Sequence, residues 1–202
     1  MEPHELTDAQ VDTLKEVGNI GAGHATTALA QMLGKKVFIS VPTVSMVEIK
    51  DIPEFLGGAE TQVVGIHFKI LGEAKGSMVL SFNTEQALFL ADTLLRAENE
   101  STEIDPDRES ALKELGNILA SAYLTALSTF LGSTLIPSVP AMTHDTAENL
   151  VDTVLDEVSK TMKHAVILET EFTLPPQILG GQFLVFFEPD SFEFILKALG
   201  MQ

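Results

Sequence analysis

Residues 14–20 read Leu-Lys-Glu-Val-Gly-Asn-Ile, and residues 112–118 read Leu-Lys-Glu-Leu-Gly-Asn-Ile. Every matched position is separated by the same step of 98 residues (112 − 14). The same step relates Thr27-Ala28-Leu29 to Thr125-Ala126-Leu127, Leu33-Gly34 to Leu131-Gly132, and Val41-Pro42 to Val139-Pro140. A constant step over such a stretch predicts that the chain contains a duplicated structural unit.

The composition restricts the class of protein. The 202 residues include 12 Lys and Arg against 29 Asp and Glu, for a formal net charge of -17, and no cysteine. This negative charge should repel phosphate backbones and anionic lipids, so we expect no nucleic-acid partner. Without cysteine there is no disulfide, thiolate nucleophile or Cys-ligated metal. Because no apolar run approaches ~20 residues and the amino terminus lacks a signal-peptide pattern, we expect a cytoplasmic protein without membrane insertion.

A long helix is predicted to carry the first copy of the motif. Thr7-Asp8-Ala9-Gln10 has the form of a capping box, and Gly34 is the expected helix stop. Helical spacing predicts a buried side made of Leu14, Val17, Gly21, Ala25 and Ala28. The opposite stripe contains Asp12, Glu16, Asn19, Gly23 and Thr27.

Three glycines lie within this predicted helix, at positions 18, 21 and 23. Each should destabilise the helix by about 1 kcal/mol relative to alanine. We therefore expect another backbone to approach closely at these positions.

A second long helix is predicted to begin at Asp105-Pro106, a capping residue followed by proline at the first helical position, and to run to about Leu131 before Gly132. It repeats the polar stripe with Ser110, Glu114, Asn117 and Ser121. The small residue at the end of each stripe leaves room beside the asparagine.

The remaining segments predict three strands and a closing helix in each copy. Expected strands are 37–49 (interrupted at Pro42), 62–71, 76–82, 133–143, 163–174 and 181–187; expected helices are 85–96 (opened by Thr84), an acidic amphipathic helix at 146–160, and 191–199. Residues 52–58 are read as a loop or a short helical turn.

Each copy therefore reads helix, strand, strand, strand, helix. We expect one α+β domain over residues 1–202, made of two repeats at about 7–96 and 105–200 and related by an internal pseudo-twofold axis. Hairpin-like connections favour a mainly antiparallel sheet, and the two long motif-bearing helices should pack over it.

The doubled Glu-x-x-Asn is the main candidate for chemistry. A solvated helix face is the simpler interpretation, since a repeat can preserve packing residues and carry polar ones along. However, polar residues are retained on a face that core packing does not constrain. A carboxylate and a carboxamide one turn apart suit ion-pair anchoring and the positioning of a water molecule, but they supply no nucleophile.

Other candidates are weaker. The five histidines at positions 4, 24, 67, 144 and 164 have no metal-site spacing and are read as structural or solvated, so no metal site is expected. The glycines from Gly18 to Gly23 lie inside a helix rather than after a strand, which argues against a dinucleotide fingerprint.

The two polar stripes resemble the paired signature of the CheC/CheX/FliY phosphatase family of chemotaxis proteins. The resemblance rests on Asp12-x-x-x-Glu16-x-x-Asn19 and Ser110-x-x-x-Glu114-x-x-Asn117, and it covers nearly the whole chain. None of the four Glu and Asn positions departs from the family pattern. Asp12 and Ser110 differ between the copies, which leaves open whether the two sites are equally active.

The resemblance implies dephosphorylation of the response regulator CheY. Asn19 or Asn117 would hold a water in line with the phosphorus, while Glu16 or Glu114 would pair with a receiver lysine, with Asp12 and Ser110 in support. The protein would need no cofactor of its own, because Mg²⁺ would come with the bound receiver. The family also implies CheD, a receptor deamidase, as a second partner. We expect its contact away from the stripes, near the acidic helix at 146–160. The alternative is a mainly non-catalytic adaptor or decoy for CheD, or a binding protein associated with the flagellar switch.

Overall fold

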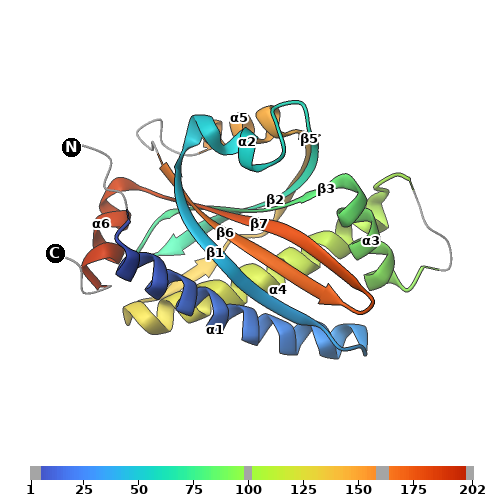
Figure 1. The fold of residues 1–202 in the computed structure, drawn as a ribbon, viewed down its shortest axis with the longest axis horizontal. Coiled ribbons are helices and arrows are strands. Elements are labelled where there is room, and N and C mark those ends of the chain that lie inside the picture. Colours follow the sequence, from blue (N-terminus) through green and yellow to red (C-terminus); the bar gives the residue numbers. More distant parts are fainter. Residues whose placement is uncertain (1–5, 98–101, 158–163, 199–202) are drawn as a thin grey trace.

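One curved antiparallel sheet with helices on both faces forms the centre of the molecule (Figure 1). The structure is a computed structural model that describes residues 6–97, 102–157 and 164–198. Its helices are α1 (Asp8–Leu33), the 3-10 turn η1 (Ile49–Asp51), α2 (Ile52–Phe55), α3 (Thr84–Leu95), α4 (Pro106–Leu131), α5 (Ala147–Glu157) and α6 (Pro189–Ala198). Its strands are β1 (Phe38–Glu48), β2 (Gln62–Gly72), β3 (Gly76–Asn83), β4 (Leu135–Pro137), β5 (Ala141–Thr146), β6 (His164–Leu174) and β7 (Gln177–Phe187).

The two copies exchange strands within this sheet. The order is β1-β6-β7-β3-β2-β4, with β5 also pairing to β2, and every pairing is antiparallel. The first strand of each copy therefore pairs with the second strand of the other copy. The third strands meet at the centre, where Gly76 lies opposite Phe187 and Ser81 lies opposite Gln182. This arrangement confirms the predicted α+β fold with internal pseudo-twofold symmetry.

The two motif helices lie antiparallel on one face of the sheet (Figure 1). Their backbones come close where Gly21 of α1 meets α4, because a Cβ placed on Gly21 would lie 2.9 Å from the Cα of Tyr123. The expected close approach is thus confirmed at Gly21. It is wrong for Gly18, where the nearest atoms belong to the side chains of Leu168 and Val41. It is also wrong for Gly23, which has nothing within 4 Å because it lies on the exposed side of the helix.

The predicted ends of both helices are confirmed. The Thr7 amide donates to Gln10 Oε1 at 2.5 Å and the Gln10 amide donates to Thr7 Oγ1 at 3.4 Å, which completes the capping box. Asp105 caps α4 through the Arg108 amide at 2.9 Å. Both helices end at a left-handed glycine, Gly34 with φ 64° and Gly132 with φ 63°.

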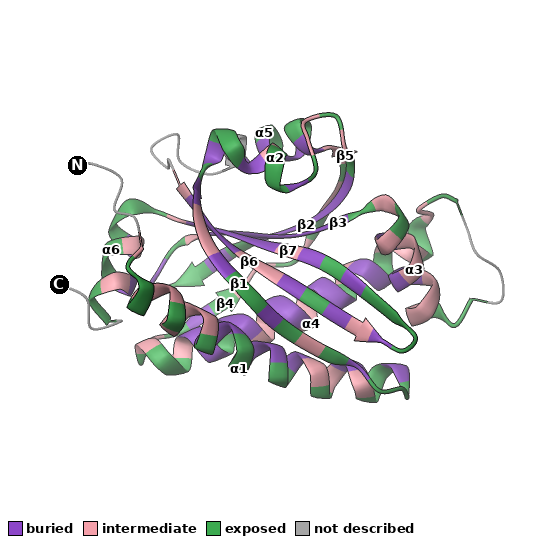
Figure 2. Ribbon diagram, viewed as in Figure 1, coloured by how far each residue is buried: buried purple, intermediate pink, exposed green. Residues whose placement is uncertain are grey.

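The core has two layers, one on each face of the sheet (Figure 2). The larger layer lies between the sheet and the motif helices and contains Phe82, Phe172 and Phe183, each no more than 1% exposed. The smaller layer lies under α2 and α5 and includes Ile52 and Leu150. The four-residue α2 confirms a short helical turn within 52–58, one of the two alternatives expected there, and gives the first copy a short counterpart of α5.

Several predicted boundaries are wrong. The single strand expected at 133–143 is split into β4 and β5, because the backbone leaves the sheet between Pro137 and Ala141. Asn83, rather than Thr84, caps α3 by accepting from the Gln86 amide at 2.8 Å. Strand β7 begins at Gln177 instead of residue 181, directly after a two-residue turn, and α6 begins at Pro189 rather than residue 191. The predicted ends of the helices at 146–160 and 191–199 lie outside the described residues.

None of the helices in the described ranges combines the length and the apolar character needed to cross a membrane.

Candidate active site

The predicted polar stripes lie on the outward faces of the two motif helices. On α1, Asp12, Glu16 and Asn19 are classed as exposed. On α4, Ser110 and Glu114 are exposed and Asn117 is half-buried. The structure thus places each set of three side chains on one helix face, in two separate places, while the buried faces of both helices turn to the sheet (Figure 2).

The glycine before each asparagine brings the helix onto the sheet. A Cβ on Gly116 would lie 2.8 Å from Ile66 Cγ2, and a Cβ on Gly18 would lie 3.1 Å from Leu168 Cδ2. These contacts leave little space for a larger side chain at either glycine. The Gly-Asn pair therefore combines a packing residue with a polar residue at the border between helix and solvent.

In the first copy, the Asn19 side chain is bound to the edge of the sheet. Its Oδ1 accepts from the Val41 amide at 2.9 Å, and its Nδ2 donates to the Val41 carbonyl at 3.3 Å. The same Nδ2 donates to the Lys15 carbonyl at 2.9 Å. The carboxamide thus pairs with both backbone groups of Val41, as a neighbouring strand would.

This pairing protects an edge strand. Strand β1 ends the sheet, and its register shifts between Ser40 and Thr43, around Pro42, as predicted for an interruption at an edge. A second residue of α1 also contributes, because the Ile39 amide donates to Thr26 Oγ1 at 3.1 Å. Unpaired edge amides cost free energy when they are buried, so Asn19 has a structural role in addition to any chemical one.

The second copy differs at the equivalent position. Asn117 lines an open groove of about 420 Å³ that also contains Ser110, Glu114 and the loop Ser138–Pro140. No hydrogen bond holds its side-chain amide in the described part of the chain. Val139, which matches Val41 at the step of 98 residues, is 88% exposed, whereas Val41 is 1% exposed. The loop between β4 and β5 thus leaves the Asn117 amide unpaired.

Both motif glutamates are available for a partner. Neither Glu16 nor Glu114 has an ion pair within the described ranges. The neighbouring Lys113 pairs instead with Glu109 one turn earlier. Each site therefore offers an exposed carboxylate that can receive a cation and a carboxamide that can donate and accept hydrogen bonds.

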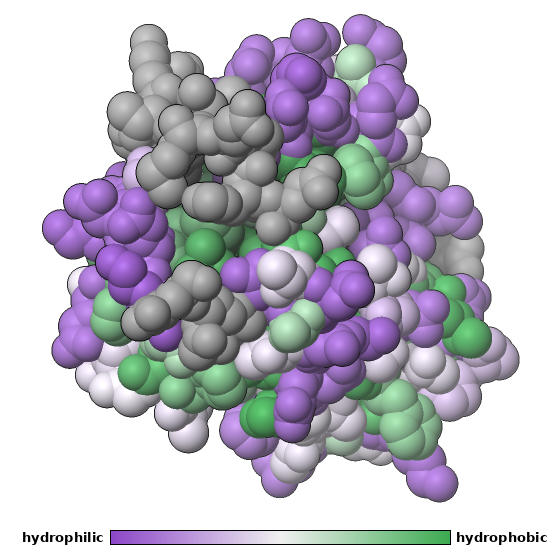
Figure 3. All heavy atoms as spheres, turned by 60° about the vertical axis from the view of Figure 1, so that its left-hand side comes forward, coloured by the Kyte–Doolittle hydropathy of each residue, from purple (hydrophilic) through white to green (hydrophobic). Residues whose placement is uncertain are grey.

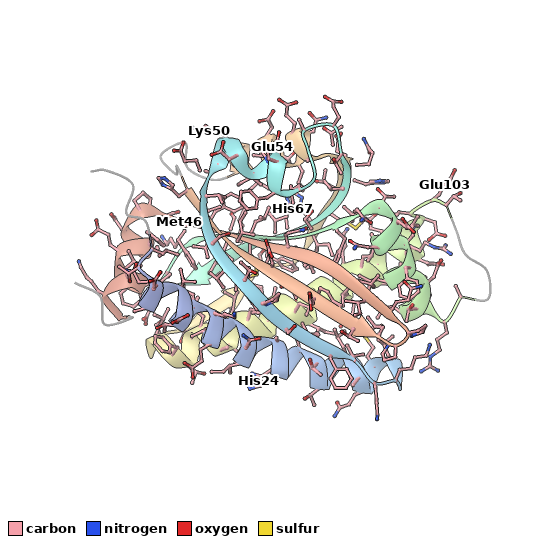
Figure 4. All side chains as sticks on the ribbon, viewed as in Figure 1. His24, Met46, Lys50, Glu54, His67 and Glu103 are labelled. Carbon is pink, nitrogen blue, oxygen red and sulfur yellow. The ribbon has the colours of Figure 1, made fainter. Side chains whose placement is uncertain are left out.

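The histidines do not form a metal centre in the described residues. His24 lies on the outer side of α1, and His67 lies buried beneath α2 (Figure 4). Among the residues that the structure describes, no group of three His, Asp or Glu side chains is arranged to hold a metal ion.

Sequence reasoning missed the residues that surround the two asparagines. The Val41 backbone hydrogen-bonds to the Asn19 side chain, whereas the loop Ser138–Pro140 makes no such bond to Asn117 in the described structure. The sequence pattern did not identify either segment as part of a site. The available signal was the repeat itself, because Val41-Pro42 and Val139-Pro140 match at the same step as the motifs.

Comparisons with known proteins agree with this architecture. The CheC-like family matches at residues 10–46 and 108–144, which contain both motifs. The CheY-P phosphatase CheC of Bacillus subtilis is 35% identical over 202 residues, which cover 96% of each protein. The crystal structure of Thermotoga maritima FliY aligns with a TM-score of 0.79 at 25% identity, covering 96% of this chain and 98% of that one. The FliM middle domain of H. pylori shares the fold with a TM-score of 0.70 at 15% identity, covering 96% and 99% of the two chains.

Proposed function

This chain belongs to the CheC-like family, and we propose that it hydrolyses the aspartyl phosphate of a phosphorylated CheY-type receiver. One observation carries the proposal. In both copies, a glutamate that has no ion pair with any described residue and an asparagine lie one turn apart on the outward face of a helix whose other face is buried in the core. The name of the B. subtilis relative supports the substrate, because that protein is a CheY-P phosphatase.

The glutamate would fix the docking of the receiver. Glu114 is exposed and lines the groove, where it would form an ion pair with a receiver lysine and so set the orientation of the phosphoryl group. Glu16 would do the same on α1. Such an ion pair positions the partner more than it adds affinity, because both groups lose hydration when they meet.

The asparagine would hold the attacking water. Its carbonyl oxygen accepts a hydrogen bond from the water, which directs the water's lone pair at phosphorus in line with the aspartyl oxygen. A bond forms between the water oxygen and phosphorus while the bond between phosphorus and the aspartyl oxygen breaks. The products are the aspartate carboxylate and inorganic phosphate, and the water protons leave with the phosphate or enter solvent. The receiver's own Mg²⁺ would neutralise the phosphoryl oxygens.

The two sites should differ in activity. Asn117 needs no rearrangement to meet a water, since nothing in the described residues holds its amide. Asn19 must give up its bonds to Val41, at about 1 kcal/mol for each hydrogen bond. We infer that the second copy performs most of the hydrolysis.

A double variant tests the proposed activity. The loss of phosphate from a phosphorylated CheY-type receiver is compared between the wild type and Asn19→Ala/Asn117→Ala, with the fold of the variant checked by circular dichroism. The proposal predicts that the double variant leaves only the receiver's own rate of dephosphorylation. A folded double variant as active as the wild type would reduce the stripes to a docking surface and favour the adaptor function.

The family resemblance also supports CheD as a second partner, and we propose α5 as its contact. This helix packs its apolar side against the smaller core layer and exposes Glu148 and Asp152. Nearby, the Asn149 side chain and the Thr146 amide hold the pKa of Asp145 below its ordinary value by hydrogen bonding to its carboxylate. Hydrophilic residues also gather at the top of the face seen in Figure 3, towards the α2 and α5 layer.

Charge reversal tests this second contact. Glu148→Arg/Asp152→Arg should weaken CheD binding and leave receiver dephosphorylation unchanged. Asp190→Arg/Glu193→Arg on α6 provides a matched control, because it reverses two exposed carboxylates on another helix. Equal CheD binding by both variants would remove α5 from the interface.

A further inference from the structure

The loop Ser138–Pro140 forms the wall of the groove that faces the motif residues of α4. At 88% exposed, Val139 is the most exposed large apolar side chain in the described part of the chain. Burying such a side chain against another molecule removes apolar surface from water and so favours binding. The loop is named here the valine ridge.

The valine ridge is held in place by the neighbouring strand. The Lys69 amide donates to Ser138 Oγ at 2.9 Å, and the Ser138 amide donates to the Lys69 carbonyl at 2.9 Å. Ser138 Oγ in turn donates to the Val139 carbonyl at 3.1 Å. Prolines stand on both sides, at 137 and 140, and restrict the backbone. A braced loop that presents an apolar tip loses little conformational entropy when a partner covers it.

The first copy has no such ridge. Val41 is 1% exposed and lies within β1, where Asn19 pairs with its backbone. The ridge is therefore a property of the second copy alone, and it stands beside the one motif asparagine whose amide is unpaired in the described structure.

We propose that the valine ridge is a docking element for the receiver at the second site, where Val139 inserts against an apolar surface of the receiver beside its phosphorylation site. This inference rests on the proposed function. The occupant follows from the geometry, because a receiver that brings its phosphoryl group to Asn117 must enter the groove and meet both walls. One wall supplies the Glu114 carboxylate and the other supplies Val139, so the contact combines an ion pair with an apolar anchor.

The experiment separates the two sites before it tests the ridge. Glu16→Arg disables docking at the first site and Glu114→Arg disables docking at the second, and neither glutamate has a partner to lose in the described structure. Val139→Asp is then added to each background, and initial rates are measured over a range of concentrations of receiver phosphorylated by a small acyl phosphate.

The inference predicts a raised KM in one background only. With Glu16→Arg, Val139→Asp should raise KM about tenfold and leave kcat within about twofold, as expected when a partly buried valine contact is lost but the water-holding amide is intact. With Glu114→Arg, it should change neither constant. Ile178→Asp is the matched control, since Ile178 is 69% exposed on β7 and does not line the groove.

Three results would overturn the inference. An unchanged KM in the Glu16→Arg background would exclude the ridge from docking while the phosphatase proposal stands. Equal effects in both backgrounds would indicate a general change of fold. A change in oligomeric state on Val139→Asp, measured by sedimentation, with unchanged KM would identify the ridge as a self-association surface. If no background shows phosphatase activity above the receiver's own rate, the proposed function itself fails.

Discussion

The backbone amide of Val41 donates a 2.9 Å hydrogen bond to Oδ1 of Asn19, across the gap between the edge strand β1 and helix α1. The equivalent pair in the second copy, Val139 and Asn117, makes no such bond. One motif asparagine therefore stabilises the fold while the other faces an open groove, although both stand in nearly identical sequence.

Replacing the two asparagines should separate stability from activity. Asn19→Ala leaves the Val41 amide unpaired at a buried position and should lower the free energy of unfolding by about 1–3 kcal/mol. Asn117→Ala removes no hydrogen bond made within the described residues and should change stability by less than about 0.5 kcal/mol. Urea unfolding of both variants measures the difference. Equal losses would mean that the Val41 bonds add little.

Alanine substitution of two glycines in α1 should change the stability of the protein in opposite directions. Gly21→Ala places a Cβ 2.9 Å from the Tyr123 Cα, which forces the helices apart and should destabilise the protein by about 1–3 kcal/mol. Gly23→Ala meets nothing within 4 Å and should stabilise the helix by about 0.5–1 kcal/mol. Thermal unfolding of the pair checks this, and a stable Gly21→Ala variant would contradict the close packing of α1 on α4.

Tyr123 should make stability fall at alkaline pH. Burial of its side chain raises the pKa of the hydroxyl to about 12, while an unfolded tyrosine titrates near 10. Between these values the folded state holds a proton that the unfolded state releases. The free energy of unfolding should therefore fall as pH rises from about 10 to about 12, by at most about 1.4 kcal/mol per unit.

The titration of Tyr123 can be observed directly, because it is the chain's one tyrosine and there is no tryptophan. Tyrosinate absorbance of the folded protein should rise only near pH 12 or on unfolding. Tyr123→Phe should remove this part of the fall in unfolding free energy at alkaline pH. Any fall that remains in this variant then comes from other groups, such as the lysines. A folded-state midpoint near 10 would show that the hydroxyl is exposed to solvent.

Much of the fold follows from local sequence signals. Capping signals predicted the ends of the motif helices correctly. These signals are the Thr7-Gln10 capping box, the Asp105-Pro106 start and the glycine after each helix. The outward-facing Glu and Asn stripes followed from helical spacing alone. These features depend on contacts within a few residues, so a single sequence can predict them.

The differences between the copies depend on distant contacts. Val41 and Val139 occupy matching places in the repeat, but regular pairing with β2 is interrupted around Val139, where Ser138 bonds to Lys69, 69 positions away along the chain. The exchange of first strands between the copies also joins distant segments. No periodicity within 133–143 distinguishes one long strand from two short ones separated by an exposed valine.

The role of the second site is tested most directly by comparing the two single asparagine variants in dephosphorylation of a CheY-type receiver, under conditions where both are fully folded. Asn117→Ala should lower kcat by about tenfold or more, because the Asn117 amide holds the attacking water. Asn19→Ala should keep most of the wild-type rate. Loss of activity in Asn19→Ala with full activity in Asn117→Ala would contradict the assignment of the hydrolytic water to Asn117 of the second copy.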